Sequence, residues 1–101
     1  LAEELKVTIL LKGHVDVICN EEKIALNRTG CAYMTKGGLG DTLAGILGAI
    51  LARKVNCFDA ACAAAYINGK AGELAAKKFG ESLMASDVIK EIPEVIKRAL
   101  R

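Results

Sequence analysis

The chain has 101 residues, 52% of them hydrophobic, and its 14 basic and 12 acidic side chains leave a net charge of +2. This length fits one small domain or part of a larger one. The balanced charge and the 4% of aromatic residues argue against a basic or base-stacking surface for nucleic acid. The longest apolar run, 43–52, is too short to span a bilayer as a helix. We expect a soluble, cytoplasmic protein that binds neither nucleic acid nor a membrane.

The N-terminal half predicts short strands. Segments 7–11 and 15–19 are apolar runs of strand length on either side of Gly13, which is the pattern of a hairpin. A polar turn follows, and 24–26 predicts a third short strand. The opening residues 1–5 resemble the last turns of an amphipathic helix whose start is missing.

Segment 27–40 has no hydrophobic period and is rich in glycine. It therefore predicts a long loop, and long loops in compact domains are often functional. Asp41 is placed to cap a helix that ends near Arg53. Gly45 and Gly48 lie inside this helix and imply that another element packs very close to it.

Two further helices are predicted toward the C-terminus. Asp59 is placed to cap an alanine-rich helix over 60–78, whose small side chains predict a neighbour at short distance. Ser86 is placed to cap the next helix, and Pro93 either ends that helix or begins a fourth segment.

The order of elements, strands first and helices after, fits either a free-standing α+β domain or the end of a larger α/β fold. Two or three short strands are too few to cover helices this apolar. The incomplete opening helix also favours the larger α/β fold.

The cysteines and the single histidine show neither a C-x-x-C pair nor the spacing of a zinc site. A disulfide framework is not expected without the pattern of a signal peptide. Free cysteines are usually buried. We expect no metal site made of protein side chains and four reduced thiols in the interior, at Cys19, Cys31, Cys57 and Cys62.

The segment 37–41, Gly-Gly-Leu-Gly-Asp, is the first chemical candidate. A glycine-rich turn that leads into a helix N-terminus binds phosphate through free backbone amides. Asp41 would repel that phosphate unless it serves the chemistry or a cation stands between them. The spacing is neither that of a Walker A loop nor that of a Rossmann fingerprint. The structural alternative is a plain glycine turn with a capping aspartate.

The turn that begins with Lys12 and Gly13 is the second candidate. The Lys12 ammonium could reach phosphate oxygens, and Gly13 would let the backbone approach them closely. The alternative is an exposed charge at a hairpin turn. His14 is expected to be a turn residue and not a general base.

Together these motifs resemble the C-terminal half of the ribokinase-like superfamily, and within it the ADP- or ATP-dependent NAD(P)H-hydrate dehydratase family. The resemblance covers nearly the whole chain. It rests on several landmarks in the right order and spacing: Leu10-Leu11-Lys12-Gly13, Asn27-Arg28-Thr29-Gly30, Met34-Thr35, the run from Gly37 to Ile46, Ala71-Gly72-Glu73-Leu74-Ala75 and Ala85-Ser86-Asp87-Val88-Ile89.

The resemblance implies a fold and a set of site residues. Residues 1–101 would be the C-terminal, nucleotide-binding part of a three-layer α/β/α fold. Asp41 would be the catalytic residue and would also contact the substrate. The nucleotide would be bound by Lys12, Gly13, His14, Val15, Asp16, Gly38, Leu39 and Gly40. The chain departs from the family pattern at Asp16, where threonine is common, at Cys31-Ala32-Tyr33, where Pro-Gly is common, and at Lys36.

The resemblance also implies an activity. The enzyme would use ADP or ATP, with Mg²⁺, to dehydrate hydrated NADH or NADPH, releasing NAD(P)H, phosphate and AMP or ADP. It would require a missing N-terminal portion and would be a homo-oligomer. Two alternatives stay open, a sugar or vitamin-precursor kinase of the same superfamily and an inactive nucleotide-binding or assembly module.

Overall fold

Three short strands form an antiparallel sheet in the order β1-β2-β3. The computed structural model describes residues 1–34 and 37–100, and its strands are β1 (Ile9–Leu11), β2 (Asp16–Cys19) and β3 (Ile24–Asn27). In the register, Ile18 pairs with Leu10 on one side and with Ala25 on the other. The predicted hairpin and third strand are therefore confirmed, each to within two residues at either end.

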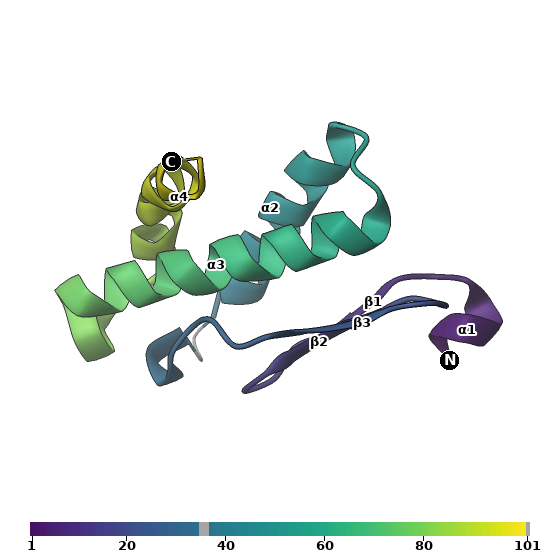
Figure 1. Ribbon diagram of the computed structural model, residues 1–101. Helices are drawn as coiled ribbons and strands as arrows, with labels where there is room; N and C mark the ends of the chain where they lie inside the picture. The colour runs from purple at the N-terminus through teal and green to yellow at the C-terminus, as the bar shows by residue number, and fades with distance from the viewer. Residues whose placement is uncertain (35–36, 101) are drawn as a thin grey trace.

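The three long helices lie on one face of this sheet (Figure 1). α3 (Cys57–Phe79) lies over the strands, and both α2 (Leu39–Ala52) and α4 (Ala85–Ala99) pack against it. Short 3-10 turns, η1 (Ala32–Met34) and η2 (Gly80–Ser82), join the larger elements, and the short α1 (Ala2–Leu5) lies at one end of the sheet. Among the described residues, no helix has the length and apolar character needed to cross a membrane.

The other face of the sheet is apolar and exposed. Because strand side chains alternate between faces, Leu10, Ile18 and Ala25 face the helices while their neighbours point away. Leu11, Ile24 and Leu26 on that outer face are 64%, 76% and 53% exposed. The described residues therefore supply two of the layers in the expected three-layer arrangement.

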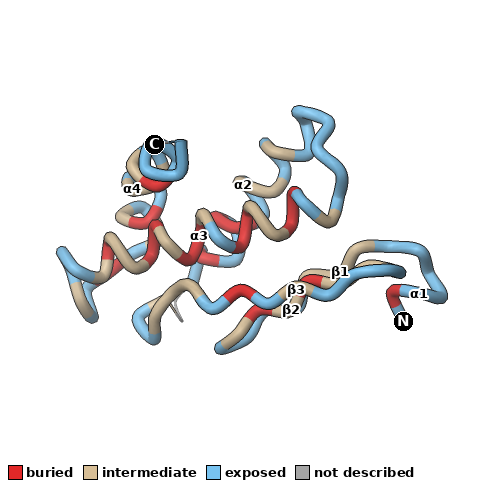
Figure 2. Tube along the Cα trace, in the orientation of Figure 1, coloured by how far each residue is buried: buried red, intermediate tan, exposed pale blue. Residues whose placement is uncertain are grey.

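Buried residues concentrate along α3, as Figure 2 shows. One cluster joins the sheet to α3 through Ile18, Ala61 and Ala65. A second cluster, with Ala71 and Ala75 at its centre, joins α3 to α4 through Leu83, Val88 and Val95. The alanines of α3 let its neighbours approach closely, as the composition predicts.

The predicted helix caps are wrong, although the helices themselves are present. α2 begins after Gly38, whose φ of 90° only glycine adopts easily, so Asp41 is the third helical residue and not the cap. The cap of α3 is Asn56, whose side chain accepts a hydrogen bond from the Asp59 amide at 3.0 Å.

The last helix also differs from expectation. α4 begins at Ala85, so Ser86 lies inside it, and the Asp87 carboxylate accepts a hydrogen bond from the Met84 amide at 2.8 Å. Pro93 lies within α4 and neither ends it nor starts another segment. Buried Val88 and Val95 hold the helix to the core on both sides of this proline.

The close approach expected at Gly45 and Gly48 is absent within the described residues, where a Cβ at either position would meet nothing within 4 Å. It occurs instead on α3. A Cβ at Gly69 would lie 2.7 Å from the Cβ of Thr29 and 2.8 Å from its carbonyl carbon. At Gly72 a Cβ would overlap the side chain of Met34. These two glycines let the loop after β3 lie directly on the helix.

Gly69→Ala is therefore expected to lower the free energy of unfolding by about 1–3 kcal/mol, because the methyl group must displace the Thr29 backbone. Gly48→Ala is the matched control on α2. It should raise stability by roughly 0.5–1 kcal/mol, since alanine is the better helix former and meets no neighbour there. Urea unfolding of both variants measures the difference. Equal effects at the two positions would contradict the close packing of Thr29 against Gly69.

The four cysteines are free, but they do not lie in the interior as expected. Cys57 is exposed, and Cys19, Cys31 and Cys62 are half-buried. Cys19 ends β2 and Cys57 begins α3, while Cys62 lies inside α3 at the edge of the cluster that joins this helix to the sheet. Burial raises the pKa of the Cys62 thiol, with Asp59 adding to the rise and Lys23 opposing it.

Candidate functional site

A cavity of about 930 Å³ lies where the β1–β2 turn, the loop after β3, the N-terminus of α2 and the middle of α3 meet. Its lining includes these residues of the predicted site: Lys12, Gly13, His14, Val15, Asp16, Leu39 and Gly40. Gly38 and Asp41 are not lining residues, but they flank Leu39 and Gly40 in the chain. Two motifs separated in the sequence are thus brought to one cavity. Thr35 and Lys36 lie outside the described residues.

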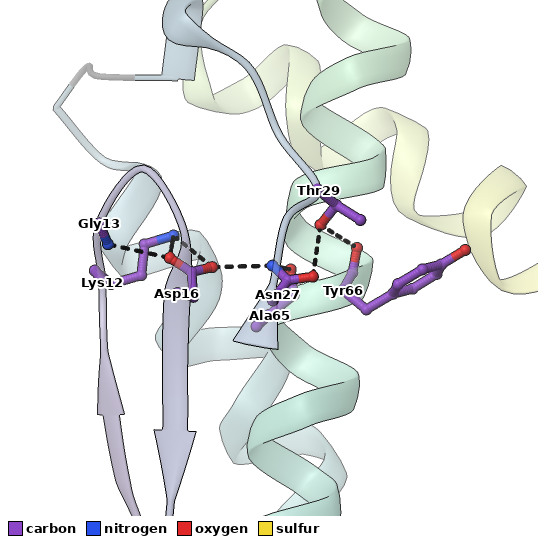
Figure 3. A network of polar contacts seen from close by, with 7 residues as sticks. All are labelled: Lys12, Gly13, Asp16, Asn27, Thr29, Ala65 and Tyr66. Atoms are coloured by element: carbon purple, nitrogen blue, oxygen red, sulfur yellow. Dashed lines mark hydrogen bonds and ion pairs between the residues drawn. The ribbon is translucent and has the colours of Figure 1, made fainter. Parts of the chain in front are cut away.

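The β1–β2 turn is held by the buried carboxylate of Asp16, which is 3% exposed. Its Oδ1 accepts a hydrogen bond from the Gly13 amide at 3.2 Å, and its Oδ2 accepts one from Asn27 Nδ2 at 2.9 Å (Figure 3). The Lys12 ammonium lies 3.3 Å from Oδ1 and 3.4 Å from Oδ2. Both carboxylate oxygens are therefore occupied by the turn itself and by β3.

Asn27 extends this network to α3. Its Nδ2 also donates to the Ala65 carbonyl at 3.2 Å, and its Oδ1 accepts from the Thr29 hydroxyl at 3.0 Å. The Thr29 hydroxyl lies 3.5 Å from the Tyr66 carbonyl, while the Tyr66 ring points away from the network (Figure 3). Loop, sheet and helix are thereby tied together beside the cavity.

A second link holds the loop after β3. The Gly30 amide donates to Glu73 Oε2 at 2.8 Å, and Lys70 pairs with the other carboxylate oxygen at 3.4 Å. Gly30 has a φ of 111°, which lets the loop turn sharply at this point. The loop wall of the cavity is therefore fixed by side chains of α3.

The N-terminus of α2 supplies free amides to the cavity. The first hydrogen bond of the helix runs from the Thr42 amide to the Gly38 carbonyl at 3.0 Å. The amides of Leu39, Gly40 and Asp41 precede it and have no acceptor within the helix. A Cβ at Gly40 would meet nothing within 4 Å, so this part of the backbone is open to a ligand. Asp41 is exposed in the same turn.

The charges around the cavity suit an anion. Lys12, whose side chain is half exposed, and Arg28 line it together with the α2 N-terminus, whose dipole also attracts negative charge. The negative charge of Asp16 is compensated by Lys12 and by neutral donors. Among the described residues, no three His, Cys, Asp or Glu side chains form a metal-binding group.

Arg28 and Asn68 are the two polar residues on which sequence reasoning about the lining most clearly fell short, since neither was in the predicted site. Arg28 occurs in the segment 27–30 and is a cation two residues before a glycine, a pattern that could have marked it. Asn68 lies on α3 beside Gly69 and is 1% exposed. Its signal in the sequence is an amide on a helix face that otherwise carries alanine and glycine, as at Ala65 and Gly72.

Comparisons with known proteins identify the family of the chain. The family model described as NAD(P)H-hydrate dehydratase matches residues 1–94. The chain belongs to this family. The resemblance found in its motifs is thereby confirmed.

Similar proteins include the bifunctional NAD(P)H-hydrate repair enzyme Nnr of Hyperthermus butylicus, 50% identical over 95 residues, which are 94% of this chain and 18% of that protein. The ADP-dependent (S)-NAD(P)H-hydrate dehydratase of Cenarchaeum symbiosum is 47% identical over 97 residues, 96% of this chain and 34% of that protein. The chain thus spans about a fifth of the length of the first relative and about a third of the second.

A solved structure shares the fold. It is the ADP/ATP-dependent NAD(P)H-hydrate dehydratase of Bacillus subtilis co-crystallized with ATP/Mg²⁺. The TM-score is 0.87 at 33% identity, and the match covers 96% of this chain and 36% of that one. The expected fold, part of a ribokinase-like α/β fold, is confirmed.

Proposed function

We propose that this chain forms the nucleotide-binding part of an ADP- or ATP-dependent NAD(P)H-hydrate dehydratase. The observation that carries the proposal is the meeting of the Lys12–Asp16 turn with the free amides of α2 at one cavity, in a chain of this family. A cavity of about 930 Å³ has room for a nucleotide, since small-molecule sites commonly measure about 300–1,000 Å³.

The phosphates of the nucleotide would bind at the cationic end of this cavity. The amides of Leu39 and Gly40 precede the first hydrogen bond of α2, and amides at this position of a helix donate to phosphate oxygens. Lys12 and Arg28 add charge-assisted hydrogen bonds. These groups also stabilise the charge that spreads over the transferred phosphoryl group.

Asp41 would act as the general base. It takes the proton from the hydroxyl of the hydrated nicotinamide ring, and that oxygen attacks the terminal phosphorus of the nucleotide. The new bond joins the ring oxygen to phosphorus, and AMP or ADP leaves. The ring then loses phosphate, with its C–O bond broken, and a proton from the adjacent carbon, which restores the double bond.

Mg²⁺ would enter with the nucleotide. Mg²⁺ is usually held by phosphate oxygens with one or two carboxylates and needs no protein cage. Such binding fits the described residues, in which Asp41 stands beside the phosphate-binding amides and no larger group of ligands occurs. The ion would neutralise phosphate charge and so reduce its repulsion with Asp41.

The remainder of the protein would complete the site. The chain covers 36% of the Bacillus subtilis enzyme. The exposed apolar side chains of the outer sheet face, Leu11, Ile24 and Leu26, offer a surface on which another layer can pack. We propose that this further part carries the wall that binds the hydrated ring. A homo-oligomer and a cytoplasmic location stay predictions.

The test incubates the complete polypeptide with hydrated NADH, Mg²⁺ and either ADP or ATP. Restored absorbance of the reduced ring, with release of one phosphate for each ring restored, is the expected result. Transfer of phosphate to a sugar or a vitamin precursor, without restoration of the ring, would show a kinase instead. Nucleotide binding with no turnover of any of these compounds would show an inactive binding module.

A further inference from the structure

Asn68 carries a buried polar atom with no partner. The residue is 1% exposed, and its Oδ1 has no hydrogen bond to any described residue. Among the side chains that the structure describes, this is the single buried oxygen or nitrogen without a partner. A buried carboxamide oxygen left in this state costs stability, so native proteins rarely keep one without a use for it.

The position of Asn68 suggests that use. It lines the cavity from the middle of α3, together with Gly69. The cations and free amides of the same cavity come from other elements, the β1–β2 turn, the loop after β3 and the N-terminus of α2. Asn68 is therefore a neutral acceptor on the helix wall of a cavity whose other walls carry the groups that bind anions.

The chemistry of the oxygen limits its partner. A carboxamide oxygen only accepts hydrogen bonds, so a ligand that hydrogen-bonds to it must bring an N–H or O–H group. Phosphate oxygens ionised at neutral pH are acceptors and cannot serve. In a nucleotide, the donors lie in the nucleoside, namely the ribose hydroxyls and the 6-amino group of adenine.

We propose that Asn68 Oδ1 accepts a hydrogen bond from the nucleoside part of the bound nucleotide. This inference rests on the proposed function. It gives the nucleotide a direction, with its phosphates at Lys12 and the start of α2 and its nucleoside against α3.

Asn68→Leu tests the proposal in the complete polypeptide. Leucine fills a similar volume and removes the unpartnered oxygen, so the melting temperature without ligand should stay the same or rise. The dissociation constant for ADP should increase about 3- to 10-fold, the loss of one hydrogen bond. Binding of inorganic tripolyphosphate, which has no nucleoside, should not change. Lys12→Ala is the comparison variant and should weaken the binding of both ADP and tripolyphosphate.

Three ADP analogues identify the donor. Inosine diphosphate lacks the 6-amino group, and the 2′-deoxy and 3′-deoxy forms of ADP each lack one ribose hydroxyl. The analogue that lacks the true donor should bind the parent protein more weakly than ADP and should lose nothing further in Asn68→Leu.

Other outcomes overturn the inference. It is wrong if Asn68→Leu binds ADP as tightly as the parent does, or if the substitution weakens the binding of tripolyphosphate as much as that of ADP. It is also wrong if ADP binding weakens but every analogue still loses affinity in the variant. Failure of the parent protein to bind ADP or ATP at all would refute the proposed function, and the inference with it. If the parent protein binds ADP but the variant gives one of the three results above, only the inference about Asn68 fails and the proposed function is unaffected.

Discussion

Asp41→Asn is expected to lower the turnover of hydrated NADH by roughly 10²–10⁴-fold, the usual contribution of a general base. Asparagine has nearly the same shape but cannot take the proton of the ring hydroxyl at neutral pH. Asp41 is exposed in the first turn of α2, so the fold should remain. The loss of a favourable interaction with the helix dipole should cost only about 0.3–1 kcal/mol of stability.

Asp59→Asn is the matched control, because Asp59 stands in the first turn of α3, and neither it nor its neighbours in the chain line the cavity. It should leave turnover unchanged. The affinity of Asp41→Asn for ADP should equal that of the parent or exceed it, since a negative charge beside the phosphates has been removed. Turnover at the parent rate in Asp41→Asn would show that the role proposed for Asp41 is wrong.

Asp16→Ala should have the second large effect. Its carboxylate is buried and accepts hydrogen bonds from the Gly13 amide and from Asn27. Removing it takes the acceptor of the Gly13 amide and one of the two acceptors of the buried Asn27 amide group, so we expect a loss of about 1–3 kcal/mol in the free energy of unfolding. Because the turn that carries Lys12 loses its anchor, ADP binding should weaken by roughly tenfold, equivalent to about 1.4 kcal/mol.

Denaturant unfolding and calorimetric titration with ADP measure these two effects. Asp16→Asn keeps one carbonyl acceptor in the same place and should lose less stability than Asp16→Ala. Glu21→Ala, an exposed carboxylate in the turn after β2, should change stability by no more than about 0.5 kcal/mol. If Asp16→Ala matches Glu21→Ala in both measurements, Asp16 does not hold the turn.

Local sequence signals predicted most of the secondary structure. Apolar runs, the first two rich in β-branched residues, predicted the three strands, because side chains of this kind fit a pleated, half-buried sheet. The alanines of 60–78 predicted a closely packed helix, and α3 is the centre of both core clusters. The glycines before Asp41 predicted a turn leading into a helix, and α2 begins there.

The helix caps show where local signals fail. Several residues near each helix start can act as the cap, and the chosen one depends on where the backbone leaves helical geometry. Gly38 precedes α2 with a φ of 90°, and Asn56 precedes α3 in an extended conformation. Asp41 and Asp59 therefore fall within the first turns, where their charge favours the helix dipole instead.

The sequence by itself determined the order of the elements, the two motifs that suit phosphate and the family to which they point. Only the tertiary structure decided that these motifs share one cavity, and that Asn68 and Arg28 belong to it. The contacts responsible join residues far apart, such as Asn27 with Ala65, 38 positions away, and Gly30 with Glu73, 43 positions away. Local propensity and spacing act over a few residues, so such contacts appear only when the chain has packed.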